Sequence, residues 1–142
     1  MVERPELGFL LSRLLRDVIE REQPILSKRE LEMWDYVVLA ALGTGPSPTQ
    51  NELAALTGRD KTRLIRNLDR LEDRGLLSRT PDPRDRRNRI VTLTPTGKRL
   101  LAECRKDIRT MEDDLLVDVA SQDRDGFETT LVALAGRDLS SP

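Results

Sequence analysis

The segment from Asp60 to Gly75 constrains the fold most, because it predicts one amphipathic helix with a basic outer face. Asp60 is a candidate N-cap, and Gly75 is placed to end the helix. At about 100° per residue, one face of this helix carries leucines: Leu64, Leu68 and Leu71. A stripe about 80° wide on the opposite side carries arginines: Arg63, Arg66, Arg70 and Arg74. We therefore expect a helix that packs through its leucines and presents guanidinium groups outward.

Two helices are expected immediately before this segment. A capping box from Ser27 to Glu30 opens the first helix, and Gly43 ends it. The side chains expected to face inward are Leu31, Trp34, Val38 and Leu42. A second capping box, from Thr49 to Glu52, opens a short helix that ends at Gly58. Helices joined in this way predict a helix-turn-helix.

After Gly75 the sequence changes from a helical to a β-prone pattern. The short runs 76–80 and 88–93 are separated by a connector, 81–87, that is rich in proline and charge. This pattern predicts a β-hairpin with a long exposed tip. The arginines expected at this tip are Arg84, Arg86, Arg87 and Arg89. A helix-turn-helix followed by such a hairpin is the winged helix-turn-helix arrangement.

Both ends of the chain are expected to be helical. Residues 6–22 carry a stripe of apolar side chains that is too broad for a monomer to cover, and Pro24 is placed to close that helix. Thr94 and Pro95 are an N-cap and a first helical residue that begin a long helix. Its apolar stripe, 101–115, is either core or dimer seam, and a shorter helix with Phe127, Leu131 and Leu134 follows. We expect Cys104 in this stripe to be a buried structural thiol; the alternative is a redox sensor.

Positive charge is concentrated in the middle of the chain. The net charge is only −1, but residues 59–89 hold eleven basic residues against six acidic ones, and the flanks are acidic. A local basic surface is expected where a protein meets DNA phosphates. The N-terminal half of a recognition helix normally meets base edges, which favours Thr62, Arg63, Arg66 and Asn67. Arg70 and Arg74, further along, would either contact phosphate or pair internally.

These charges also have a simpler interpretation. Arginines on a helix can be merely solvated, or can pair with Asp69 or Asp73 of the same helix. The arginines of the hairpin tip could serve solubility, although beside a basic helix they suit insertion into the minor groove. Asp85 is either an orienting residue that pairs with an arginine and fixes the tip, or a turn residue.

Composition argues against an enzyme. The chain has no histidine and one cysteine, which removes the commonest general base and the usual zinc ligands. We find no phosphate-binding glycine loop and expect no metal, cofactor or catalytic residue. No apolar run approaches the roughly 20 residues that span a membrane, and no signal peptide is recognisable. A cytoplasmic location is therefore expected.

Short motifs between residues 49 and 100 resemble the MarR family of bacterial transcriptional regulators. They are Asn51-Glu52-Leu53-Ala54, the stretch from Leu68 to Arg79, the wing motif Asp85-Arg86-Arg87, and Leu93-Thr94-Pro95-Thr96-Gly97. All stand at the family's spacing, and the flanking helices agree across nearly the whole chain. The resemblance implies a mainly α protein with a small β-hairpin wing, in which a winged helix-turn-helix lobe is attached to a helical dimerisation stem.

The resemblance also implies partners and residue roles. Family members form homodimers that usually repress transcription from palindromic operators, and many release DNA when a small, often phenolic, anion binds between stem and lobe. The family's wing arginine matches Arg87, which would enter the minor groove, and its recognition-helix arginine matches Arg66. We expect Trp34 in the core, with a place in an effector pocket as the alternative. The chain lacks the N-terminal cysteine of the family's peroxide sensors and, without histidine, the usual ligands of its zinc sensors.

We expect one structural domain in three parts: an N-terminal dimerisation helix (1–26), a DNA-binding lobe (27–94) and C-terminal dimerisation helices (95–142). The expected DNA contacts are Thr62, Arg63, Arg66, Asn67, Arg70, Arg84, Arg86 and Arg87. The alternative is a winged-helix protein-interaction module that does not read DNA. The arginines argue against it, because a protein interface would normally prefer apolar anchors.

Overall fold

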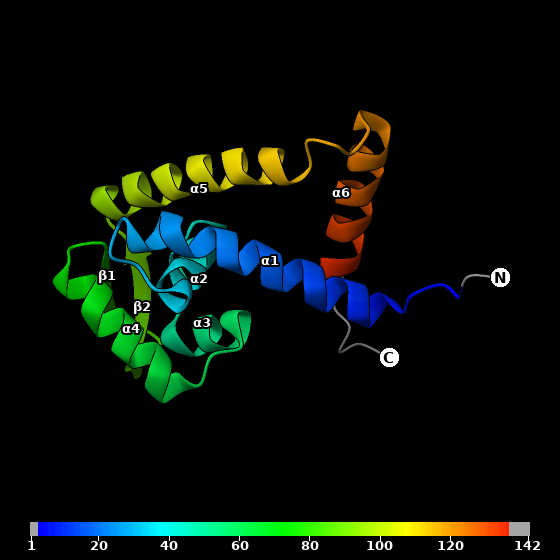
Figure 1. Cartoon of the computed structure of the whole chain (residues 1–142). Coiled ribbons are helices and arrows are strands. Elements are labelled where there is room, and N and C mark those ends of the chain that lie inside the picture. The colour runs from blue at the N-terminus through cyan, green and yellow to red at the C-terminus, as the bar shows by residue number, and fades with distance from the viewer. Residues whose placement is uncertain (1–2, 137–142) are drawn as a thin grey trace. The chain divides into compact units, whose positions relative to one another are not determined.

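The computed structural model describes residues 3–136, which form six helices and one antiparallel hairpin (Figure 1). In chain order the elements are α1 (Leu7–Ser27), α2 (Met33–Leu42), α3 (Gln50–Thr57), α4 (Lys61–Asp73), β1 (Leu77–Asp82), β2 (Asp85–Leu93), α5 (Pro95–Leu115) and α6 (Ser121–Ala135). The chain divides into two compact units, one up to Ile108 and one from Arg109 onward. The predicted winged helix-turn-helix, α2 to β2, lies wholly within the first unit.

The leucines of α4 anchor the core of the first unit, as the sequence predicts. Leu64, Leu68 and Leu71 are fully buried, because their spacing places them on one face of the helix. They belong to one apolar cluster with residues from α2, α3 and the hairpin, including Val38, Leu39, Leu53, Leu77 and Val91. Each fully buried side chain of this size contributes about 1.5–3 kcal/mol of transfer free energy. This cluster fixes which face of α4 points outward.

The predicted helix boundaries from Thr49 onward are confirmed. The Thr49 hydroxyl accepts from the Glu52 amide at 3.2 Å, and the Asp60 carboxylate accepts from the Arg63 amide at 3.2 Å. Gly58 follows α3 with φ of 69°, in the left-handed region that ends helices most readily at glycine. The predicted N-cap of α5, Thr94, is confirmed as well, since the Thr94 hydroxyl accepts from the Gly97 amide at 3.0 Å.

Two predictions for the first two helices are wrong. Pro24 does not close α1, which continues to Ser27 with Leu26 buried in its last turn. Proline removes only one helical hydrogen bond, and burial of Leu26 offsets that loss. The predicted capping box at Ser27 does not open α2, because α2 starts at Met33. The cap is formed instead by the Asp35 carboxylate, which accepts from the Glu32 amide at 2.9 Å.

The hairpin is longer and its turn is tighter than predicted. The two strands pair from Leu77 opposite Leu93 out to Asp82 opposite Asp85, with an irregularity after Pro81. Residues 81–87 are therefore mostly strand and not a loose loop. Backbone pairing does not require apolar side chains when both faces of a ribbon are solvated, and that explains the error.

Apolar side chains remain exposed on α1 and, separately, on α6. On α1 they are Leu7, Phe9, Leu10, Leu11 and Leu15; on α6 they are Phe127, Leu131, Val132 and Leu134. Within α5, Leu101, Cys104 and Ile108 are buried, and burial raises the pKa of the Cys104 thiol. That shift disfavours the reactive thiolate. Within residues 3–136, no helix has the length and apolar character that crossing a bilayer requires.

Candidate nucleic-acid interface

The first two turns of α4 present an exposed polar surface. Thr62, Arg63 and Arg66 are exposed, and within residues 3–136 neither arginine side chain has a hydrogen-bond or ion-pair partner. They lie opposite the buried leucines, so the packing of α4 aims them away from the core. Unpaired guanidinium groups on a helix can donate two parallel hydrogen bonds to a guanine edge or to a phosphate.

Asn67 does not lie with these outward residues. Only 2% of it is exposed, and both ends of its amide are occupied. Its Nδ2 donates to Asp35 Oδ1 at 2.8 Å, and its Oδ1 accepts from Arg59 Nε at 3.0 Å. Asn67 therefore joins α4 to α2 and to the turn before α4.

Arg70 of α4 and Arg74, the C-cap residue directly after it, are paired within the protein. Arg70 Nη2 donates to Asp35 Oδ1 at 2.5 Å, and this hydrogen bond raises the pKa of the Arg70 guanidinium. Arg74 donates to the backbone carbonyls of Glu30 at 2.8 Å and Arg29 at 3.0 Å. Phosphate contact and internal pairing were the two roles expected for these arginines, and the structure shows internal pairing for Arg70 and for Arg74. Asp35 is the residue that sequence reasoning missed here, because nothing in its local pattern marks it as buried.

Arg79, also missed by the sequence reasoning, ties the recognition helix to the wing. From β1, its Nη2 donates to Asp69 at 2.6 Å and to Glu72 at 2.9 Å. The amide of Arg79 also donates to Glu72 Oε2 at 3.0 Å, and only 10% of its side chain is exposed. The hydrogen bond from Arg79 lowers the pKa of Glu72. The expected pairing of Asp69 with an arginine of its own helix is replaced by this contact between elements.

The hairpin tip carries exposed arginines at its turn and on β2. Arg84, Arg86 and Arg87 are exposed, and their side chains have no ion-pair partner in the described part of the chain. The Asp85 carboxylate accepts from the Arg87 amide at 3.0 Å. Asp85 therefore fixes the backbone that carries Arg87, which is the geometry of the turn residue considered above.

Trp34 is not the core residue that its spacing predicts. It is 36% exposed, and the Arg59 guanidinium lies over its ring, 4.5 Å from the centroid. A hollow of about 300 Å³ beside this pair is lined by Glu32, Arg59, Arg63, Arg66, Asn67 and Arg70. The structure thus adds Arg59, from the α3–α4 turn, to the basic surface of α4.

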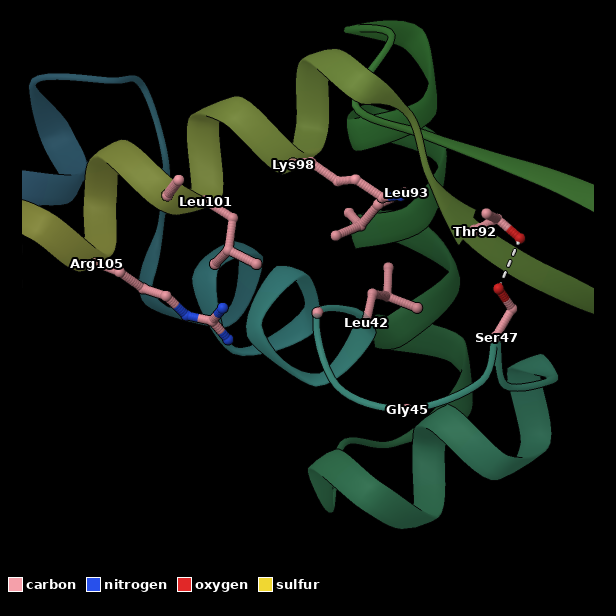
Figure 2. Close-up of a pocket in the computed structure, with 10 residues that line it drawn as sticks. Leu42, Gly45, Ser47, Thr92, Leu93, Lys98, Leu101 and Arg105 are labelled. Carbon is pink, nitrogen blue, oxygen red and sulfur yellow. Dashed lines mark hydrogen bonds between the residues drawn. The ribbon is translucent and has the colours of Figure 1, made fainter.

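A larger cavity, of about 530 Å³, opens near the start of α5 (Figure 2). Its apolar wall includes Leu42, Leu93 and Leu101, and two cations, Lys98 and Arg105, line it from α5. At one side the Thr92 hydroxyl donates to the Ser47 hydroxyl at 3.0 Å. That bond joins the α2–α3 linker to β2. Trp34 does not line this cavity.

Comparison of the sequence with known proteins agrees with this fold. A family model described as the MarR family matches residues 29–88. The transcriptional regulator HosA from Escherichia coli O111:H- is 30% identical over 108 residues, which cover 76% of this chain and 76% of HosA. A putative transcriptional regulatory protein for the hcr operon of Thauera aromatica is 25% identical over 107 residues, or 75% of this chain. The matched stretch spans 64% of that relative's length.

Solved structures share the fold over nearly the whole chain. The transcriptional repressor CouR, solved with a 23-mer DNA duplex, is 31% identical, with a TM-score of 0.78 over 93% of both chains. CouR from Rhodococcus jostii RHA1 has also been solved with p-coumaroyl-CoA; that structure is 29% identical, with a TM-score of 0.74 over 92% of both chains. These similarities confirm the winged helix-turn-helix fold expected from the sequence.

Proposed function

The chain belongs to the MarR family of transcriptional regulators, and we propose that it represses transcription by binding a palindromic operator as a homodimer. The observation that carries this proposal is the pair of exposed basic surfaces, one on α4 and one on the wing. Their arginine side chains have no hydrogen-bond or ion-pair partner within residues 3–136, while those of Arg70 and Arg74 are paired within the protein. The lobe thus holds its recognition helix with one set of arginines and leaves another set for a ligand.

The two surfaces have different roles in this proposal. Thr62, Arg63 and Arg66 meet base edges and phosphates in the major groove, because they lie on the outward face of the first turns of α4. Arg87, supported by Arg84 and Arg86, enters the adjacent minor groove, where Asp85 fixes its backbone. Asn67 and Arg70 act indirectly, by holding α4 against α2.

Homodimer formation is supported by the exposed apolar side chains of α1 and α6. A monomer rarely exposes contiguous apolar patches of this kind unless they bind a partner. Two-fold symmetry of the protein predicts an inverted-repeat site whose half-site centres lie about one helical turn apart. Regulation of transcription also requires access to the chromosome, so this function places the protein in the cytoplasm.

Release by a small-molecule effector is the remaining part of the proposal. The cavity in Figure 2 combines an apolar wall with Lys98 and Arg105, a combination that suits a small amphipathic anion. The structure of CouR with p-coumaroyl-CoA is the precedent for an anionic ligand in a similar fold. Since Ser47 and Thr92 join the α2–α3 linker to β2 at this cavity, a ligand there could shift the wing relative to α3.

Selection of DNA by the purified protein tests the proposal. Fragments recovered from a random library and sequenced should share one inverted repeat. A winged-helix module that binds only proteins would recover no common sequence, and that result would favour the alternative function.

A further inference from the structure

The hollow beside Trp34 is lined entirely by charged and amide side chains. Small-molecule pockets are mostly apolar, so this lining does not suit a drug-like or aromatic ligand. It suits a hydrated anion with several acceptor oxygens, because arginine forks match such groups bidentately.

Positive charge in the hollow exceeds the negative charge that faces it. Four arginines line it, and one of them, Arg70, is neutralised by Asp35 and Glu32. Arg59, Arg63 and Arg66 have no carboxylate partner within residues 3–136. The site therefore holds three uncompensated guanidinium groups, and Glu32 is the one carboxylate in its lining.

Arg59 is held in place by contacts that leave its terminal nitrogens available. Its Nε donates to Asn67 Oδ1 at 3.0 Å, and its planar group lies over the Trp34 ring. Within the described residues, neither terminal nitrogen of Arg59 has a hydrogen-bond partner. A guanidinium fixed in this way loses little side-chain entropy when it binds an anion.

We infer that this hollow binds one phosphodiester of the DNA backbone, with Arg59 and Arg63 as its two donors. The inference rests on the proposed DNA binding and adds a backbone contact to it: Arg59 joins Arg63, at the edge of the major-groove surface of α4, in binding a phosphate. Arg59 lies in the turn before α4, and Arg63 lies in its first helical turns, so a phosphate between them fixes the register of the recognition helix. Contacts of this kind position a protein on the duplex without reading its sequence.

The experiment needs no operator, since a phosphate contact is independent of sequence. The probe is a mixed-sequence DNA duplex of about 25 base pairs, which spans two half-sites. Its affinity is measured at several salt concentrations for the parent, for Arg59→Gln and for Arg63→Gln. Each substitution should make the slope of log K against log salt shallower, by at most about 0.9 per bound subunit, because both arginines neutralise the same phosphate. Arg63→Gln guards against misfolding, because its side chain has no partner among the described residues.

Two control variants make the test specific to the hollow. Glu32→Gln removes the carboxylate at the site and should tighten binding at low salt, the opposite sign to the arginine changes. Arg16→Gln removes the charge of an exposed arginine opposite the apolar stripe of α1 and should leave the slope unchanged.

Trp34 provides a direct readout, because it is the chain's single tryptophan. Trp34 emission should change when the parent binds the duplex, because the bound phosphate would hydrogen-bond to the Arg59 guanidinium that lies over the Trp34 ring.

The inference is overturned if the parent binds the duplex while both arginine variants keep the parental slope and Trp34 emission stays constant. DNA binding itself would survive that result. If the parent binds no duplex even at low salt, the proposed function fails, and the phosphate site fails with it.

Discussion

Asp35 on α2 and Asn67 on α4 are hydrogen-bonded at 2.8 Å in the interior of the lobe, where each is at most 2% exposed. The same Asp35 oxygen also accepts from Arg70, and the other oxygen accepts from the Glu32 amide. One buried carboxylate thus caps α2 and holds the recognition helix. The direction of the outward arginines depends on this contact as well as on the leucines behind it.

Replacing Asp35 with alanine should lower the free energy of unfolding by about 2 kcal/mol. The change leaves the amide of Asn67 and the α2 cap without their acceptor, and unsatisfied buried groups cost about 1–3 kcal/mol. Arg70 is half-exposed, so in the variant water can solvate its guanidinium. The loss of stability therefore stays below that expected when a fully buried ion pair is broken. Urea denaturation measures the effect, with the exposed Arg63→Ala as a control expected within about 0.5 kcal/mol of the parent. Parental stability of Asp35→Ala would show that the contact does not hold α4.

Glu72 and Arg79 should make stability depend on pH. Arg79 holds the pKa of Glu72 below its ordinary value of 4.5. The pair therefore contributes its full stabilising free energy at pH values above 4.5. This contribution is lost as pH falls through the lower, folded-state pKa. Glu72→Gln should therefore cost about 1 kcal/mol or less near neutral pH, given its partial exposure, and progressively less in acid.

The same pH series in an Arg79→Gln background provides the control. There, Glu72→Gln should have a smaller pH-dependent effect, because the side-chain hydrogen bond that most lowers the pKa of Glu72 is absent and the backbone amide of residue 79 remains. An undiminished pH-dependent difference in that background would assign the shift to another group.

The sequence predicted the elements whose signals are local. The caps at Thr49, Asp60 and Thr94 and the leucine face of α4 are confirmed, since each depends on residues three or four apart. The wrong predictions involve packing between distant segments. α1 continues past Pro24 because Leu26 is buried against distant segments, and no local cap motif indicates such a contact.

The candidate site divides in the same way. The exposed arginines of α4 follow from helical periodicity, whereas its paired arginines depend on contacts with residues 35 to 45 positions earlier in the chain. Arg59 was missed because it lies in a turn, outside the periodic pattern. Its stacking on Trp34 joins two residues that no spacing rule connects.

Gly97→Ala should destabilise the junction between the hairpin and α5. A Cβ at this position would lie 1.9 Å from the Leu76 carbonyl oxygen, so the backbone must move. Overpacking of this kind costs about 1–3 kcal/mol. Thermal unfolding measures the loss. Gly126→Ala, inside α6 with nothing within 4 Å of its Cβ, is the matched control and should stabilise the protein by up to about 1 kcal/mol.

Arg87→Ala should weaken DNA binding and largely keep the preference for the major-groove bases. The wing arginine contributes a minor-groove contact in the proposed complex, and base identity there is read only coarsely. Titration of the variant against the selected duplex, and against duplexes with single substitutions, measures both quantities. If Arg87→Ala bound every duplex as the parent does, the wing would have no role in binding.

Sequence-specific DNA binding by α4 is the central claim, and the ratio of two dissociation constants tests it most directly. The first is measured for the selected inverted repeat and the second for a scrambled duplex of equal composition, at the same salt concentration. The parent should bind the repeat at least about 10³-fold more tightly. Arg66→Ala should lose about 1–3 kcal/mol of discrimination at one position in each half-site. Equal affinity of the parent for both duplexes, or no binding to either at low salt, would contradict the claim.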